Sequence, residues 1–160
     1  MKLCDILKEA TVMVPLKSIS RDEAIQELLS QLEKLGYLSA TVKLIAGIEE
    51  LEINQCTAVG RGVAYPHATS IEIDNLVSIL GISYKGIDYN APDGQLCHLI
   101  LLTLSPIEEP DEHRKFTSLF RKMISQPNIR SNLLESNNSS EVIDIINNWE
   151  EFEKSNEDFD

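Results

Sequence analysis

The sequence has few residues that could form stabilising disulfide bonds or bind a metal ion. Its three cysteines, Cys4, Cys56 and Cys97, are an odd number and lie far apart, which suits neither a disulfide framework nor a zinc site. No apolar run approaches the roughly 20 residues that cross a bilayer. The N-terminus, from Met1 to Ile6, also lacks the apolar region and cleavage site of a signal peptide. These absences predict a cytoplasmic protein that does not insert into a membrane.

Basic residues are also scarce. Lys and Arg together number 14 against 26 Asp and Glu, which gives a net charge of −12 at pH 7. Phosphate backbones and anionic lipids repel such a chain, so nucleic acid and membrane surfaces are poor candidate partners. Basic patches on other proteins are better candidates. Solubility alone also explains the charge.

The length of 160 residues fits one domain, and about 70% of the unfolded surface can be buried at this size. We expect this domain to occupy residues 1–149. The remaining residues, 150–160, have few large apolar side chains and six acidic ones. They are expected to form a solvated or frayed acidic tail.

The hydrophobic pattern predicts helices at both ends of the chain and strands between them. Ser20 can cap the first helix with Glu23 completing a capping box, and Gly36 ends it. The run from Leu96 to Leu104 is almost wholly apolar, which suits a strand buried on both faces. This order indicates an α/β sandwich or an α+β layer fold. The expected helices are 20–35, 40–51, 110–125, 130–134 and 140–149, and the expected strands are 76–84 and 96–104, with loops at 55–70 and 85–94.

The loop from Gly60 to His67 is the strongest candidate for chemistry. Gly60 and Gly62 permit close approach of the backbone to a ligand, and Pro66 narrows the conformations available to His67. A neutral imidazole is a nucleophile at pH 7, and one ring nitrogen can attack phosphorus while the other donates a hydrogen bond. Arg61, the Thr57 and Thr69 hydroxyls and the glycine amides could bind the added charge. An ordinary loop histidine is the alternative.

The other two histidines differ in context. His98 lies inside the apolar strand run and is expected to be structural. His113 follows Asp111 and Glu112 at the start of a helix, where an exposed surface residue is the simpler interpretation. The spacing of His67, His98 and His113 matches no common metal-ligand pattern, so we predict no metal site.

The stretch from Thr57 to Ala68 resembles the active-site signature of the enzyme IIA proteins of the phosphotransferase system. The resemblance is to the mannitol/fructose type and to its nitrogen-regulatory relatives, and it extends more weakly from about Leu3 to Trp149. The signature is roughly a Thr, two residues, and Gly-x-Gly-[Val/Ile]-Ala-x-Pro-His. The matching positions are Thr57, Gly60, Gly62, Val63, Ala64, Pro66 and His67.

This resemblance implies a phosphotransferase with a mixed central β-sheet flanked by helices in a single compact domain, and no cofactor. His67 would accept phosphate from a small histidine phosphocarrier protein, which enzyme I charges from phosphoenolpyruvate. His113 would lie beside His67 and stabilise the phosphoryl group. Thr57, Gly60, Arg61 and Gly62 would bind the phosphate or the partner.

Two positions depart from the family pattern. The family usually has an Arg-Glu pair upstream of the active histidine, and the corresponding residues here are Leu51 and Glu52. Arg61 is a nearby cation that could replace the missing arginine. Arg114 stands where the family usually has Leu after the second histidine.

Three downstream roles follow from the resemblance. A nitrogen-type regulator would bind target proteins according to its phosphorylation state, whereas a sugar-transport component would pass phosphate to the cysteine of an enzyme IIB. The 160 residues contain no permease segment and no second carrier domain, which favours the regulator. The third role is a protein-binding module that has kept the fold but lost phosphoryl transfer. The presence of Leu51 in place of the family's arginine suggests this role.

Overall fold

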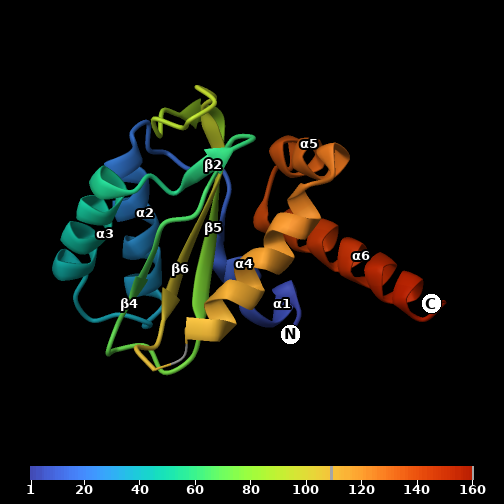
Figure 1. The fold of residues 1–160 in the computed structure, drawn as a ribbon, viewed down its shortest axis with the longest axis horizontal. Helices are drawn as coiled ribbons and strands as arrows, with labels where there is room; N and C mark the ends of the chain where they lie inside the picture. The colour runs from blue at the N-terminus through green and yellow to red at the C-terminus, as the bar shows by residue number, and fades with distance from the viewer. Residues whose placement is uncertain (109, 160) are drawn as a thin grey trace.

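The apolar run predicted as a buried strand forms the central strand, β6, of a mixed six-stranded sheet (Figure 1). The computed structural model describes residues 1–108 and 110–159. Strand β6 pairs antiparallel with β5 and parallel with β3 and β4, and the strand order is β1-β5-β6-β3-β2. The strands are β1 (Val12–Met13), β2 (Ala58–Gly60), β3 (Val63–Ala64), β4 (His67–Thr69), β5 (Val77–Ile87) and β6 (Cys97–Ser105).

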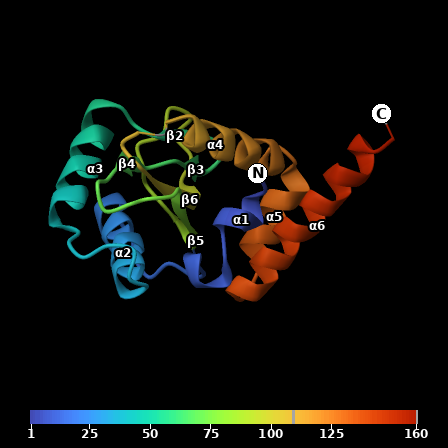
Figure 2. The ribbon, with the colours of Figure 1, turned by 90° about the horizontal axis from the view of Figure 1, so that it is seen from below.

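Helices cover both faces of this sheet. Helices α2 and α3 lie on one face, and α1, α4, α5 and α6 lie on the other (Figures 1 and 2). Alternate residues of β6 point to opposite faces, so Leu99 and Leu101 join one apolar cluster while Ile100 and Leu102 join the other. The helices are α1 (Leu3–Ile6), α2 (Arg21–Lys34), α3 (Val42–Asn54), α4 (Pro110–Ile124), α5 (Pro127–Glu135) and α6 (Ser139–Glu157), with a 3₁₀ turn at Glu9–Thr11.

The predicted fold class, a mixed central sheet flanked by helices, is confirmed. Ser20 caps the first predicted helix as expected, because the Glu23 amide donates to Ser20 Oγ at 3.3 Å, but within the described residues the Glu23 side chain does not accept the return bond of a capping box. The helical spacing of the apolar residues from Ala24 to Leu35 predicts one buried face, and the helix buries this face from Ala24 to Leu32 while Leu35 is exposed. No helix within residues 1–108 and 110–159 has the length and apolar character needed to cross a membrane.

Two sequence predictions were wrong in detail, and two short elements were missed. The region 55–70 is not one loop, because it contains β2, β3 and β4, and His67 is the first residue of β4. The expected loop 85–94 begins later, since β5 continues to Ile87. The short elements α1 and β1 near the N-terminus were not predicted.

The expected frayed tail is largely helical. Helix α6 continues through Glu157, and the Glu150 carboxylate accepts hydrogen bonds from the Leu3 and Cys4 amides at 2.8 and 3.1 Å. Lys122 on α4 lies 2.7 Å from a carboxylate oxygen of Glu153. These contacts tie the helix to the body of the protein, although Figure 2 shows its last turns extending beyond the other elements. The domain boundary at residue 149 stays a prediction, and Asp160 lies outside the described residues.

Candidate functional site

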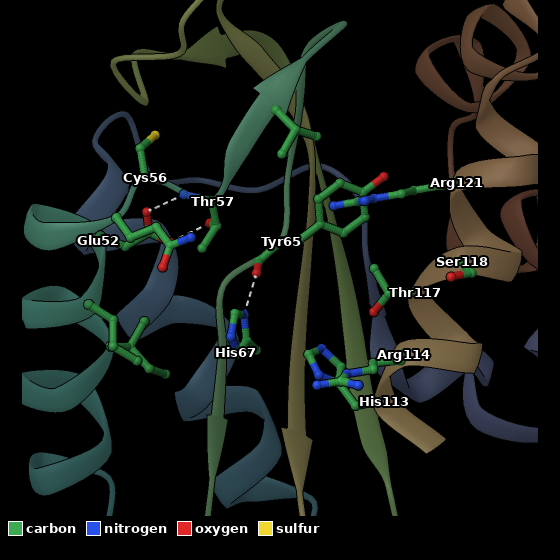
Figure 3. Close-up of a pocket in the computed structure, with 14 residues that line it drawn as sticks. Glu52, Cys56, Thr57, Tyr65, His67, His113, Arg114, Thr117, Ser118 and Arg121 are labelled. Carbon is green, nitrogen blue, oxygen red and sulfur yellow. Dashed lines mark hydrogen bonds between the residues drawn. The ribbon is translucent and has the colours of Figure 1, made fainter. Parts of the chain in front are cut away.

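A cavity of about 490 Å³ lies between α3, the short strands β2–β4 and helix α4. Thr57, Tyr65 and His67 line the side formed by the strands and the segment that precedes them, and His113 lines the opposite side from α4 (Figure 3). The structure thus brings together four residues that the sequence separates by up to 56 positions. Two of them are the histidines singled out above.

The backbone around His67 is fixed by the sheet. The Thr103 amide of β6 donates to the Pro66 carbonyl at 3.0 Å, and β4 continues this parallel pairing. The exposed imidazole has Nδ1 3.0 Å from the Tyr65 carbonyl oxygen (Figure 3). Because a carbonyl only accepts, Nδ1 carries the proton in the neutral ring and Nε2 carries the lone pair. His67 therefore presents Nε2 as its nucleophilic nitrogen.

His113 lies against His67. The two ring centroids are 4.9 Å apart, and the ring planes are inclined at 40°. Burial of the half-buried His113 lowers its pKa, and the neighbouring His67 and Arg114 lower it further. A neutral imidazole at pH 7 has one donor and one acceptor, so His113 can interact with a group bound on His67 without adding a full charge.

We expect the His113 ring to titrate below its ordinary pKa of 6.5, which an NMR pH titration of its ring protons would measure. The folded protein then binds fewer protons at His113 than the unfolded chain does. The contribution of this group to stability is therefore complete above about pH 6.5 and is lost as the pH falls through the window below it. A midpoint at or above 6.5 would contradict this assignment.

A buried carboxylate organises the other side of the cavity. Glu52, only 3% exposed, accepts from the Thr57 amide at 3.0 Å, from the Thr57 hydroxyl and from the Tyr89 hydroxyl at 3.4 Å. The Thr57 carbonyl in turn accepts from the Tyr65 amide at 3.2 Å. Since the Tyr65 carbonyl holds His67 Nδ1, a chain of hydrogen bonds runs from Glu52 to the imidazole. Burial, followed by the nearby Glu52 charge, raises the pKa of Tyr89, so its hydroxyl remains a donor.

The Gly60–Gly62 tripeptide lies elsewhere. It forms the turn between β2 and β3, with φ values of 100°, 61° and 75°, and the Arg61 amide donates to Asp93 Oδ2 at 2.9 Å. A Cβ at Gly62 would meet the Leu96 carbonyl oxygen at 3.1 Å, so this turn requires glycine for its own geometry. None of the three residues lines the cavity that contains His67. Their role in binding phosphate or a partner stays a prediction.

Helix α4 contributes residues that the sequence reasoning did not assign to the site. Arg114, Thr117, Ser118 and Arg121 line the cavity together with His113. Their spacing of three, four and seven residues places them on one face of a helix, which is the signal that could have identified them. The Arg121 guanidinium lies 4.7 Å from the centroid of the Tyr65 ring, and burial raises the pKa of Tyr65 to about 12.

The remaining positions of interest are also located. Leu51 lines the cavity, so no arginine enters it from α3 at this place. His98 lies outside the cavity, with Nδ1 2.8 Å from the Ser83 carbonyl, as expected for a structural histidine. Among residues 1–108 and 110–159, no cluster of three or more His, Cys, Asp or Glu side chains could hold a metal ion.

Comparison with known proteins identifies relatives of this fold and sequence. The chain is 29% identical over 147 residues to the fructose-specific EIIABC component of Bacillus subtilis. The aligned region covers 92% of this chain but only 23% of the length of that relative. It is 24% identical over 148 residues to a nitrogen regulatory protein of Bradyrhizobium diazoefficiens, covering 91% of this chain and 95% of the relative.

A solved structure shares the fold as well. The nitrogen regulatory protein IIA-Ntr of Neisseria meningitidis superimposes with a TM-score of 0.80 at 24% identity, over 89% of this chain and 97% of that one. Residues 5–149 match the family model described as "Phosphoenolpyruvate-dependent sugar phosphotransferase system, EIIA 2". This match covers most of the chain, including both histidines of the cavity. The chain therefore belongs to the EIIA 2 family of the phosphoenolpyruvate-dependent sugar phosphotransferase system.

Proposed function

We propose that this protein accepts a phosphoryl group on His67 from a small histidine phosphocarrier protein, which receives it from phosphoenolpyruvate through enzyme I. The observation that carries the proposal is the hydrogen bond from Nδ1 to the Tyr65 carbonyl, which reserves Nε2 for attack. Membership of a phosphotransferase family supports it, as does the second imidazole 4.9 Å away. No metal or cofactor takes part in the step.

The transfer is an in-line exchange between two nitrogens. The lone pair of His67 Nε2 attacks the phosphorus carried by the donor's phosphohistidine, and a new N–P bond forms. The donor's N–P bond breaks, and its electron pair returns to the donor ring nitrogen. The Nδ1 proton of His67 stays on the ring and continues to donate to the Tyr65 carbonyl, which stabilises the positive charge of the phosphorylated ring.

This geometry predicts which nitrogen is phosphorylated. After incubation with enzyme I, the phosphocarrier and phosphoenolpyruvate, ³¹P and ¹⁵N NMR of the labelled protein should show an N–P bond at Nε2 of His67. Phosphate found at Nδ1 would mean that the Tyr65 hydrogen bond does not set the reactive tautomer, because that bond and the new one need the same nitrogen.

For the downstream role we propose a nitrogen-type regulator, in which the phosphorylation state of His67 controls the binding of target proteins. A relative named as a nitrogen regulatory protein matches over 91% of this chain, which supports this role. Phosphorylation adds about −1.5 to −2 charge, enough to alter local binding electrostatics. Leu51 and Val59, both about half exposed, surround the site with apolar surface suited to a protein partner.

Delivery of phosphate to an enzyme IIB cysteine is the second candidate, favoured by the 29% identity to a fructose-specific EIIABC component. The two roles separate when phosphorylated protein is mixed with purified enzyme IIB domains. Rapid loss of label to an IIB cysteine supports sugar transport. Retention of label, together with target binding that differs between the two phosphorylation states, supports regulation. A protein that takes no label but still binds targets would be the transfer-defective module.

A further inference from the structure

The α4 side of the cavity is positively charged, although the protein as a whole is strongly acidic. The whole chain has a net charge of −12, yet the cavity is lined by two arginines, Arg114 and Arg121, and one carboxylate, Glu52. The Glu52 oxygens already accept hydrogen bonds from Thr57 and Tyr89. The cavity therefore has the local charge of a site for an anion.

The two arginines are not equivalent. Arg121 lies over the Tyr65 ring at 4.7 Å and is held there by that aromatic face. Arg114 is exposed and, within residues 1–108 and 110–159, forms no ion pair. Its side chain extends from α4 beside His113 toward the strand that carries His67 (Figure 3). Arg114 is thus the cation that remains available to a group bound on His67.

A buried hydroxyl lies next to this arginine. Thr117 Oγ1 is inaccessible to solvent and has no hydrogen-bond partner in the part of the chain that the structure describes. Thr117 also lines the cavity, one helical turn after His113. A buried hydroxyl without a partner costs about 1–3 kcal/mol, so such groups usually have a partner in the functional state. Because Thr117 lines the cavity, rotation of its side chain about χ1 would turn the hydroxyl toward an anion bound there, which would supply an acceptor for it.

We propose that Arg114 and Thr117 form a phosphoryl-anchoring wall on α4, which binds the oxygens of the group carried by His67. The guanidinium donates charge-assisted hydrogen bonds, and the Thr117 hydroxyl donates a third. This wall supplies the positive charge from the opposite side of the cavity to Leu51. The inference rests on the proposed function, since the anion is the phosphoryl group on His67.

The test compares Arg114→Leu and Thr117→Val with Lys115→Leu. Lys115 is the adjacent cation on α4, is exposed and does not line the cavity, so its loss changes net charge equally. We expect Arg114→Leu to slow label uptake and shorten the lifetime of the phosphohistidine, each about tenfold, and Thr117→Val to do so less. Lys115→Leu should behave as wild type, and Arg114→Lys should recover part of the loss.

A second measurement separates anchoring from a general structural effect. The ³¹P resonance of the phosphoprotein should shift in Arg114→Leu and Thr117→Val but not in Lys115→Leu. If wild type is labelled and Arg114→Leu matches Lys115→Leu in rate, lifetime and resonance, the anchoring wall is rejected and the proposed function stands. If wild type itself takes no label, both are rejected.

Discussion

Replacing His67 by alanine should reduce phosphate uptake from the phosphocarrier to the level of a blank without this protein. Removing a nucleophile leaves no group to form the covalent intermediate, so we expect a loss of at least about 10³-fold. The His67 side chain is exposed, and its backbone pairing within β4 does not depend on the ring. The folded structure should therefore survive, as far-ultraviolet circular dichroism and the thermal midpoint would show.

Two controls sharpen this result. Thr69 was a candidate for binding the added charge, but it does not line the cavity, so Thr69→Ala changes another exposed residue of β4 and should retain full uptake. His113→Ala should still accept some phosphate on His67, but onward transfer or the lifetime of the phosphoprotein should fall, because the neighbouring ring is lost. Full labelling of His67→Ala would show that another residue is the acceptor, and unchanged kinetics in His113→Ala would remove that residue from the site.

The second large effect is expected at Glu52. In Glu52→Ala, the Thr57 amide and the Tyr89 hydroxyl lose their acceptor in the interior, and we expect the free energy of unfolding to fall by about 2–4 kcal/mol. Uptake of phosphate should also slow, because the hydrogen bonds that run through Thr57 and Tyr65 hold Nδ1 of His67. Urea denaturation and the initial labelling rate measure the two consequences.

Glu50→Ala is the matched control for Glu52. Glu50 lies within α3, two residues before Glu52, and its side chain is exposed. Its replacement by alanine should therefore change the free energy of unfolding by less than about 0.5 kcal/mol. Equal stability of the Glu50 and Glu52 variants would mean that the buried carboxylate does not hold the Thr57 segment. A destabilised Glu52→Ala with normal labelling would separate the stabilising role from the positioning of His67.

The layers of this fold were predictable because their signals are long. Helix α2 has a continuous apolar face and a cap at Ser20, and β6 is apolar on both faces. The strands β2, β3 and β4 have two or three residues each, too few for an alternating pattern to emerge. Strands β3 and β4 form because β6 pairs with them, and β2 forms because it then pairs with β3, so all three depend on tertiary contacts.

The site was predictable only in part. The pairing of His67 with His113 followed from the family resemblance, since no local pattern connects residues 46 positions apart. Arg61 was the obvious substitute for a missing cation because it is close in sequence, but the tight β2–β3 turn directs it away from the cavity. Arg114 is far from His67 in the sequence but lines the same cavity. This proximity results from the packing of α4 against the sheet, which the sequence alone does not reveal.

The most direct test of the account is to incubate the wild-type protein with enzyme I, the phosphocarrier and phosphoenolpyruvate carrying labelled phosphate, and to map the label by peptide mass spectrometry. The account predicts one acid-labile phosphoryl group per chain, located on His67. An unlabelled protein, or label on any residue other than His67, would contradict it.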